Sequence, residues 1–255
     1  MSGIGIGIGL SNVAAGRGSS LPYTAHADLY AWDFTAPVLN GAKVQSVPEM
    51  ARGAANAWEQ TVAASQPDAV ANGASFTADL SRSMALVGGG AVPLNGSNGI
   101  YFACNVQVIN KANAPRLIKV YDGVNTTQTG RLIVDVLSYA GGQPRSHIDQ
   151  TDSNAWVWRQ DPSGITVTDT VWVTIEEQHD FVTPANNRAW FNGVEVAANI
   201  QTPFAATAYP TTDSLGAAIG GSFAGVYNTI AIGQGVLPPA VRQSFSDWAN
   251  SVRPI

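Results

Sequence analysis

The chain has 255 residues, of which 45% are hydrophobic and 12% are charged, and its net charge is −5. This length allows one large β domain or two small ones, and a charged fraction of about half the usual ~25% predicts a surface rich in uncharged polar residues and glycine. The 13 Lys and Arg residues stand singly, so we expect no nucleic-acid partner.

The first 20 residues are rich in Gly, Ser and Ala, and residues 3–10 have the sequence GIGIGIGL. In an extended backbone the large apolar side chains all fall on one side, and the glycines leave the other side bare. Such an edge invites pairing with another chain. We therefore predict an anchoring arm over residues 1–28, which contacts other subunits through Ile4, Ile6, Ile8 and Leu10.

The opening lacks a charged n-region, and glycine interrupts its apolar stretch, so we expect no signal peptide and synthesis in the cytoplasm. The chain has no run of about 18 apolar residues, so we expect no membrane insertion. The Ala- and Gln-rich stretch at 48–63 predicts a short helix that begins at Pro48, although Gly53 and Asn56 weaken it.

Strand patterns then dominate the chain. Residues 30–34 are the first apolar stretch that we expect to be ordered. Alternating apolar residues and aromatic content predict strands at 99–109, 116–122, 131–139, 155–160, 171–178, 188–196 and 225–233. Turn sequences separate these strands without intervening helices, which indicates an antiparallel sandwich or barrel. The only cysteine, Cys104, falls in an apolar strand, so we expect a buried, inert thiol and no disulfide.

The C-terminal segment changes period. Val241, Phe245, Trp248 and Val252 recur at spacings of 4, 3 and 4, which is one face of a helix. A proline pair at 238–239 suits the first turn of a helix. We predict one helix at about 239–251 that closes the sandwich.

Residues 64–252 resemble the concanavalin A-like, laminin G-like jelly roll. The likeness is carried by the order of features: the paired strands in VWVTIEEQHDFVTPANNRAWFNGVEV, and then the glycine pair, strand and short helix in LGAAIGGSFAGVYNTIAIGQGVLPPAVRQSFSDWA. Asn192-Gly193 also suits a type I′ hairpin turn. The resemblance implies an all-β jelly-roll β-sandwich over 29–255, with an extended N-terminal arm and a short C-terminal helix.

The alternating Gly-Ile opening resembles the starts of some tailed-phage and prophage virion proteins. Jelly rolls of this type also occur on phage head spikes, head fibres and tail fibres, and on gene transfer agent particles. Together the two resemblances imply a homo-oligomeric virion protein, located on a phage or phage-like particle, that binds other virion subunits through residues 1–20 and a host surface polysaccharide through its jelly roll.

The jelly-roll family includes glycosidases, which need two carboxyl groups close together. The family's glucanase motif is absent. The one Glu pair, Glu176-Glu177, has adjacent positions on a strand and therefore points to opposite faces. We expect a protein that is not an enzyme. His26, His147 and His179 adjoin no nucleophile motif and are interpreted as structural or solvated, with His179 and Glu177 in contact at the surface.

No cofactor is expected, but a calcium ion is left open as an alternative. Laminin G-like domains hold Ca²⁺ at the rim of the sandwich in some cases, and SHIDQTDSN (146–154) offers Asp149 and Asp152 as oxygen ligands. Short loops of this composition are more often simple turns.

Aromatic residues are the remaining candidates for binding. Trp156 and Trp158 share one face of a strand, where they either fill the core or stack against a sugar ring. Nearby Arg159, Asn187 and Arg188 would supply hydrogen bonds to a glycan. The leading hypothesis is a spike, fibre or decoration subunit that displays a glycan-binding jelly roll. The alternative is a free carbohydrate-binding or glycan-cleaving jelly-roll domain.

Overall fold

The protein is described by a computed structural model of the whole chain. The structure describes residues 21–76, 82–86, 99–110, 116–122, 131–137, 142–149, 156–162, 165–180, 182–201, 215–220 and 223–255. Within these ranges the chain forms strands β1 to β18, two short 3₁₀ turns at Ala63–Ser65 and Pro184–Asn186, and a single α-helix near the C-terminus. Every pairing between the described strands is antiparallel, as expected for an antiparallel sandwich.

One sheet, which we call the helix-side sheet, contains the longest strands. Its order is β15 (Val194–Val196), β14 (Arg188–Phe191), β13 (Trp172–Asp180), β8 (Gly99–Val108), β18 (Gly225–Gln234) and β1 (Leu29–Asp33). The second sheet, which we call the far sheet, runs through β16 (Ala198–Gln201), β12 (Trp156–Pro162), β11 (Gln143–Asp149), β10 (Arg131–Leu137), β9 (Arg116–Asp122), β17 (Leu215–Gly220), β7 (Ser83–Leu86) and β4 (Gly53–Glu59).

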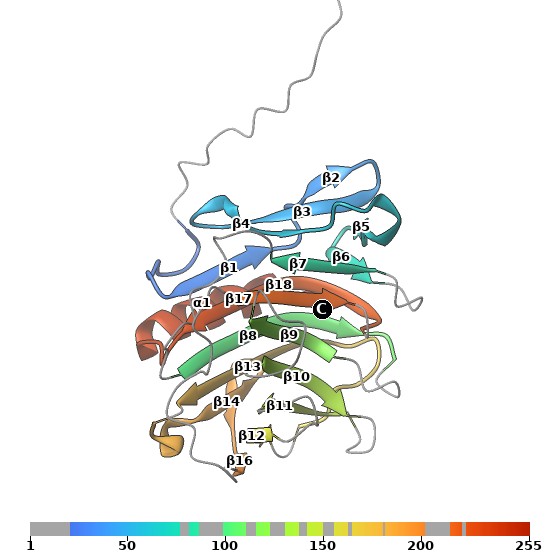
Figure 1. Cartoon of the computed structure of the whole chain (residues 1–255). Coiled ribbons are helices and arrows are strands. Elements are labelled where there is room, and N and C mark those ends of the chain that lie inside the picture. Colours follow the sequence, from blue (N-terminus) through green and yellow to red (C-terminus); the bar gives the residue numbers. More distant parts are fainter. Residues whose placement is uncertain are drawn as a thin grey trace, which may run out of the picture.

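Strand β3 (Lys43–Glu49) joins the two sheets at one end of the sandwich (Figure 1). It pairs with β4 of the far sheet and, at one position, with β1 of the helix-side sheet. Three short strands complete this end: β2 (Val38–Asn40), β5 (Asp68–Val70) and β6 (Gly73–Phe76). Strand β6 also pairs with the first residues of β18.

The expected helix at 48–63 is wrong, because this segment forms a hairpin. Pro48 lies inside β3, and Gly53 begins β4 with φ +72°, a conformation that an α-helix does not contain. Trp58 of β4 is fully buried opposite Val47, so packing in the sandwich overrides the local helix signal.

Alternation along the strands builds the core between the two sheets. The inward residues of β8 are Ile100, Phe102, Cys104, Val106 and Val108. They pack with aromatic side chains from several strands, including Trp32, Trp58, Phe76 and Tyr227. The Tyr227 hydroxyl donates a hydrogen bond to the Leu117 carbonyl, which ties β18 to β9 of the far sheet.

Cys104 lies in this core, as expected. Its side chain is 1% exposed, and burial raises the pKa of its thiol. A buried thiol that stays protonated is unreactive towards solvent reagents.

The helix α1 (Pro239–Val252) packs on the outer face of the helix-side sheet (Figure 1). Its first residue is a proline, and Val241, Phe245 and Ala249 form its buried stripe. The sheet offers small residues below it, because Ala31, Ala103 and Ala231 face outward in one row across β1, β8 and β18. The predicted helix at 239–251 is therefore confirmed, with one further residue at its end.

Residues 21–28, at the end of the expected arm, lie against this helix. The Tyr23 ring packs on Phe245 and Trp248, with ring centroids 5.6 and 5.5 Å apart. The anchoring residues expected from the sequence, Ile4, Ile6, Ile8 and Leu10, lie outside the described residues.

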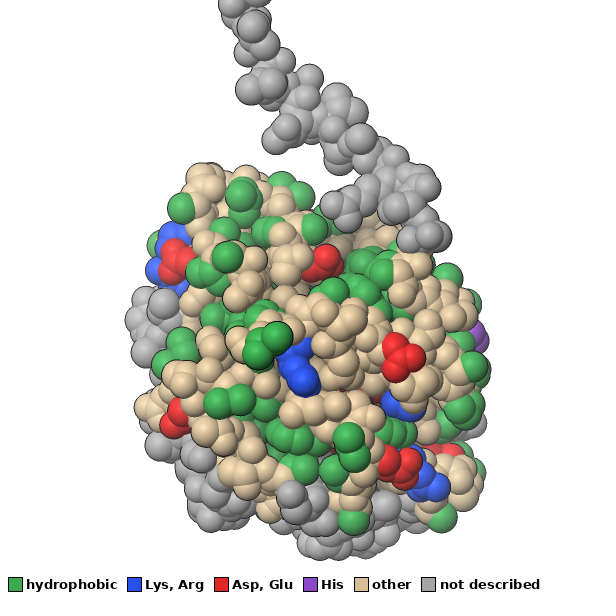
Figure 2. Space-filling view, turned by 180° about the vertical axis from the view of Figure 1, so that it is seen from behind, with side chains coloured by type: hydrophobic (Ala, Val, Ile, Leu, Met, Phe, Trp, Pro, Cys, Tyr) green, Lys and Arg blue, Asp and Glu red, His purple; other side chains and the backbone are tan. Residues whose placement is uncertain are grey.

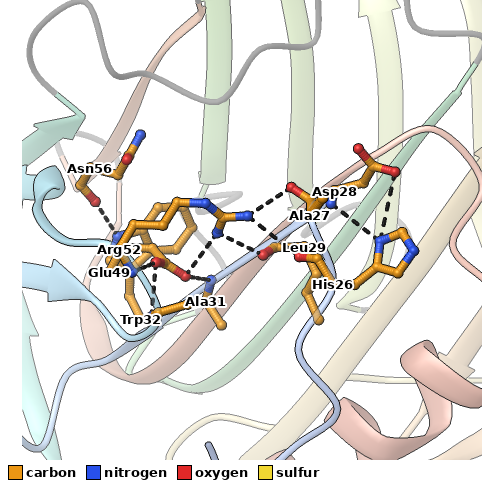
Figure 3. A network of polar contacts seen from close by, with 10 residues as sticks. His26, Ala27, Asp28, Leu29, Ala31, Trp32, Glu49, Arg52 and Asn56 are labelled. Carbon is orange, nitrogen blue, oxygen red and sulfur yellow. Dashed lines mark hydrogen bonds and ion pairs between the residues drawn. The ribbon is translucent and has the colours of Figure 1, made fainter. Parts of the chain in front are cut away.

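A polar network fixes the chain where β1 begins (Figure 3). Arg52, in the turn between β3 and β4, donates hydrogen bonds to the carbonyls of Ala27 and Leu29 at 2.7 and 3.0 Å. The buried Glu49 carboxylate accepts hydrogen bonds from the backbone amides of Ala31, Ala51 and Arg52, and its oxygen lies 3.4 Å from the Arg52 guanidinium. The network therefore connects the β3–β4 turn to the start of the helix-side sheet.

Charged side chains are sparse on the surface. Figure 2 shows one face of the molecule, on which Lys, Arg, Asp and Glu stand singly or in small groups of opposite charge among uncharged atoms. Within the described parts of the chain, no helix is long and apolar enough to span a membrane.

Candidate functional site

The helix-side sheet extends beyond the edge of α1 and leaves a pocket on its outer face. The pocket has a volume of about 340 Å³, which is within the range of small-molecule sites, ~300–1,000 Å³. We call it the outer-face pocket. Its apolar lining is Val236, Leu237 and Pro239, and its polar and aromatic lining is Gln178, Asn186, Arg188, Trp190, Glu195 and Arg242.

Strand register places these side chains on one face. Gln178 of β13 is opposite Arg188 of β14, and Trp190 of β14 is opposite Glu195 of β15. Residues that are directly opposite in an antiparallel pair point to the same face. The three strands therefore present two neighbouring rows of side chains to the pocket, one with Gln178 and Arg188 and one with Trp190 and Glu195.

The turn between β14 and β15 holds the row of Trp190 and Glu195 in place. Asn192 and Gly193 have φ of +54° and +81°, so both residues adopt the left-handed conformation that a type I′ turn requires. The Asn192 side chain also accepts a hydrogen bond of 2.9 Å from the backbone amide of Thr174 in β13. The hairpin turn predicted from the sequence is confirmed.

Arg242 forms the wall of the pocket on the helix side. Its guanidinium carbon lies 4.0 Å from the centre of the Trp190 ring, a cation–π contact. Its Nη1 is 3.3 Å from the Glu176 carboxylate, and its Nη2 donates to the Gln243 side chain at 2.5 Å. Because Arg242 covers the ring, Trp190 is only 7% exposed and offers little surface for stacking.

Glu176 lies below Arg242 and is fully buried under α1. Its carboxylate accepts hydrogen bonds from the Tyr101 hydroxyl at 2.9 Å and from the Ser246 hydroxyl at 2.6 Å. Burial raises the pKa of Glu176, and these hydrogen bonds and Arg242 oppose that rise. This cluster attaches the helix to the sheet.

Arg188 and Glu195 form an ion pair at the rim of the pocket, with Nε and Oε1 3.2 Å apart. The Arg188 guanidinium also donates to the carbonyl of Ala185 at 2.7 Å. The Glu195 side chain is 58% exposed at the rim of the pocket.

The connection between β13 and β14 is held by Asp180. Its carboxylate accepts hydrogen bonds from the amides of Val182 and Thr183 and from the Asn186 side chain, at 2.8 to 2.9 Å. The neighbouring Asn187 is buried, and its side chain accepts a hydrogen bond from the Asp180 amide. Asn187 therefore supports the loop, whereas Arg188, its partner in the sequence-based prediction, lines the pocket.

A second polar cluster lies inside the sandwich. Glu177 and His179 of β13 point inward and meet Ser146 of β11, and all three are buried. The Ser146 hydroxyl donates to Glu177 at 2.5 Å and lies 3.3 Å from His179 Nε2, and this nitrogen is 3.5 Å from the Glu177 carboxylate. The expected surface contact of His179 with Glu177 exists, but it is in the interior. Glu176 and Glu177 do point to opposite faces, as the alternation predicted.

Burial lowers the pKa of His179 to about 3, so its imidazole is neutral at physiological pH. Substrate has no access to this cluster because every member is enclosed between the two sheets. We interpret the cluster as a structural contact between β13 and the far sheet.

The other residues predicted from the sequence are only partly placed. Trp156, Trp158 and Arg159 belong to β12, but their side chains lie outside the described residues. Asp149 ends strand β11, so Ser146 to Asp149 are a strand where a loop was expected, and Asp152 lies outside the described residues. Among the described residues, no group of three His, Cys, Asp or Glu side chains is arranged to hold a metal ion. The calcium site stays a prediction.

The sequence analysis missed Gln178, Glu195 and Arg242. Two of them could have been found from the sequence. Pairing the predicted strands on either side of Trp190 places Gln178 and Glu195 on the same face of the sheet. Arg242 could not, because the reach of a helix side chain depends on how the helix sits on the sheet.

No protein-family model and no curated protein matches this chain. Solved structures do. Trypanosoma rangeli sialidase has a TM-score of 0.55 and 10% identity, and the match covers 91% of this chain and 34% of the sialidase. The carbohydrate-binding module CBM40 of the Ruminococcus gnavus IT-sialidase, solved with α2,3-sialyllactose, has a TM-score of 0.45 and 15% identity, over 65% of this chain and 88% of the module. The leech intramolecular trans-sialidase has a TM-score of 0.42 and 14% identity, over 59% of this chain and 24% of that protein.

At these identities the likeness shows the fold alone, a jelly-roll β-sandwich, and this chain spans about one third of the T. rangeli sialidase. The expectation of a protein that is not an enzyme is wrong. That expectation rested on the missing glucanase motif, whereas the solved structures that resemble this chain include a sialidase. A shared fold leaves the activity to be decided by the site.

Proposed function

We propose that this chain is a glycan-binding jelly roll that its N-terminal arm holds on a phage or phage-like particle. The single observation that carries the glycan-binding part is the outer-face pocket. It combines an apolar wall with Gln178, Arg188, Glu195 and Asn186 around one cavity of about 340 Å³. Apolar walls with a few placed polar groups are typical of sites for small ligands such as sugar units.

The arm supports the particle part of the proposal. Residues 3–10 alternate glycine with a large apolar residue, and this opening resembles that of phage virion proteins. The described chain reaches β1 through residues 21–28, where Tyr23 and the Arg52 network attach it to the sandwich. Because residues 21–28 are attached to the sandwich, an arm that binds a particle would keep the whole domain on that particle.

Glycan binding is tested with the full chain on a glycan array, followed by titration calorimetry of each glycan that binds. Glu195→Ala should weaken binding about tenfold, because it removes an exposed carboxylate at the pocket mouth. Val194→Ala is the matched control, since Val194 is the adjacent residue in β15, lies outside the pocket and is itself exposed. Absence of binding to every glycan, by protein with an intact thermal transition, would contradict the proposal.

Glycan cleavage is the second candidate function, and two carboxyl groups favour it. Glu195 at the rim and Glu176 below Arg242 flank Trp190 in one row of outward positions. A glycosidase uses a carboxylate together with a carboxylic acid of raised pKa, and burial raises the pKa of Glu176. Cleavage would require Arg242 and the Ser246 side chain of α1 to move off Glu176, which is fully buried. Release of reducing ends by the wild-type chain, lost in Glu195→Gln, would support this candidate; intact glycans after prolonged incubation would contradict it.

A further inference from the structure

Strand β2 is an open edge at the end of the sandwich where β3 joins the two sheets. Among the described strands it pairs only with β3, and Figure 1 shows it on the outside of this end. All three of its residues, Val38, Leu39 and Asn40, are exposed. The unpaired backbone groups of such an edge can accept a further strand.

The β2 edge carries no charge that would repel an incoming apolar strand. No charged residue stands between Asp33 and Lys43, and the Lys43 ammonium is paired with the Asp68 carboxylate of β5, on the other side of β3. Leu39 is opposite Val44, which points into the core, so Leu39 lies on the core-side face of the sheet. It is nevertheless 51% exposed. The apolar face of this sheet therefore extends past the core and ends uncovered.

Residues 3–10 have the pattern that suits this edge. In an extended backbone their large apolar side chains fall on one side, where they would cover Leu39 of a strand beside them. The glycines on the opposite side add no side chain to the outer face of β2. The segment also carries no charge, so its pairing with the β2 edge involves no burial of an ionised group.

The position of Leu21 gives residues 3–10 the reach to contact a neighbouring copy. Leu21 packs on the same apolar cluster as Met50, which directly follows β3, whereas β2 pairs with the opposite end of β3. Residues 11–20 span up to about 35 Å when extended, which exceeds the ~18 Å radius of gyration of a compact chain of this size. Every copy carries both the segment and the edge, so one head-to-tail contact can link many copies.

We propose that residues 3–10 of one copy add a strand to the β2 edge of a second copy, with their isoleucine side chains over Leu39. Main-chain hydrogen bonds to β2 and apolar contacts on the core-side face hold the two copies together. The proposal rests on the proposed role of the arm and specifies its partner as another copy of this chain.

Disulfide trapping tests whether the arm of one copy reaches β2 of another. Each full-chain variant with one new cysteine in the arm is mixed with Leu39→Cys under mild oxidation; the arm variants are Ile4→Cys, Ile6→Cys and Ile8→Cys. Cys104 is buried and does not take part. We expect at least about fivefold more linked heterodimer, identified by mass spectrometry, from the best arm variant with Leu39→Cys than with Val171→Cys, which is equally exposed outside β2. Equal yields with the two acceptors would overturn the proposal.

A double variant that combines Ile6→Cys with Leu39→Cys in one chain tests whether the arm folds back on its own edge. A link that forms only within one chain, and never between the mixed single variants, would make the chain's own arm the occupant and would overturn the proposal.

Sedimentation equilibrium of the full chain measures the same contact without new cysteines. Leu39→Asp places a charge against the isoleucines and should weaken self-association at least about tenfold, with an unchanged thermal transition because Leu39 is exposed. Val171→Asp is the matched control and should leave self-association unchanged. A wild-type chain that stays monomeric at about 100 μM, or equal association in Leu39→Asp, would overturn the proposal. The role of the arm on a particle fails by a different result, wild-type incorporation of the chain with Ile4→Asp, Ile6→Asp and Ile8→Asp.

Discussion

Arg52 is a single side chain that joins three parts of the chain. It donates to carbonyls at 27 and 29, lies beside the buried Glu49 carboxylate, and stacks on the Tyr30 ring with its guanidinium carbon 3.8 Å from the ring centre. Glu49 keeps its backbone amide donors when Arg52 is changed, so the loss is limited to Arg52's own bonds. We expect Arg52→Ala to lower the free energy of unfolding by about 1–2 kcal/mol, measured by urea denaturation.

Arg52→Lys is the informative comparison for this network. Lysine keeps the charge but lacks the planar fork that reaches two carbonyls at once, so it should recover only part of the loss. Full recovery with lysine would mean that charge alone matters at this position.

His179 predicts how stability depends on pH. The unfolded chain takes up a proton near the ordinary pKa of 6.5, whereas burial lowers the pKa in the folded protein to about 3. Between these values the unfolded state binds more protons, so the free energy of unfolding falls as the pH is lowered. From pH 7 to pH 5 the histidine alone should account for a loss of about 2 kcal/mol.

Denaturation curves of the wild type and His179→Gln at the two pH values test this. The variant should lose about 2 kcal/mol less than the wild type over the same interval. His26→Gln serves as the control, because His26 lies partly exposed near the surface. Identical pH dependence in the wild type and His179→Gln would contradict the assignment.

At the scale of elements, the β14–β15 hairpin positions Arg188, Trp190 and Glu195 in the lining of the outer-face pocket. Gly193 has φ +81°, and a Cβ at this position would lie 3.0 Å from the Asn250 side chain. Gly193→Val places a β-branched residue in the left-handed region, which should cost at least about 1–2 kcal/mol of unfolding free energy and weaken glycan binding through Trp190 and Glu195. Gly193→Asn should cost less, because asparagine tolerates this conformation. Thermal melting measures the loss of unfolding free energy, and calorimetry measures the glycan affinity. An equal loss of unfolding free energy in the two variants would refute the backbone argument.

The sequence predicted the central elements well for physical reasons. Every inward position of β8 is apolar, and the stripe of α1 recurs at helical spacing, so each of these two patterns indicates one face that is buried along the element. The β3–β4 hairpin was missed because Pro48 and an alanine-rich composition imitate a helix start, and only pairing with β1 and β7 decides its structure.

The candidate site was predictable only in part. Arg188 was identified because it begins a strand beside a loop, whereas Gln178 resembles any polar residue at a strand end until the register places it beside Arg188. Arg242 depends on the position of α1 over the alanine row. Which outward positions the helix covers and which it leaves open is a property of the tertiary packing, and that property determines where the pocket lies.

At the scale of the whole molecule, the proposed arm and the sandwich make separable predictions. Replacing Ile4, Ile6 and Ile8 with Asp should abolish incorporation into the particle, because an apolar groove cannot accept three carboxylates. The melting temperature of the isolated chain should stay within about 2 °C of the wild type if the sandwich forms its core without these residues. Incorporation is measured by co-sedimentation with particles.

Three serine substitutions at Gly3, Gly5 and Gly7 form a matched control, since they alter the opposite side of the same segment. Incorporation of the Asp variant at the wild-type level would refute the anchor. A large fall in its melting temperature would instead assign residues 1–20 to the fold itself.

Cys104 can report when the two sheets of the sandwich separate. It is the only cysteine, it lies at the centre of β8 between the two sheets, and its thiol is buried with a raised pKa. A thiol reagent can therefore modify the chain only when the sandwich separates around β8, and each modification event counts one such opening. The rate of labelling measures the population of the opened state without any engineered reporter.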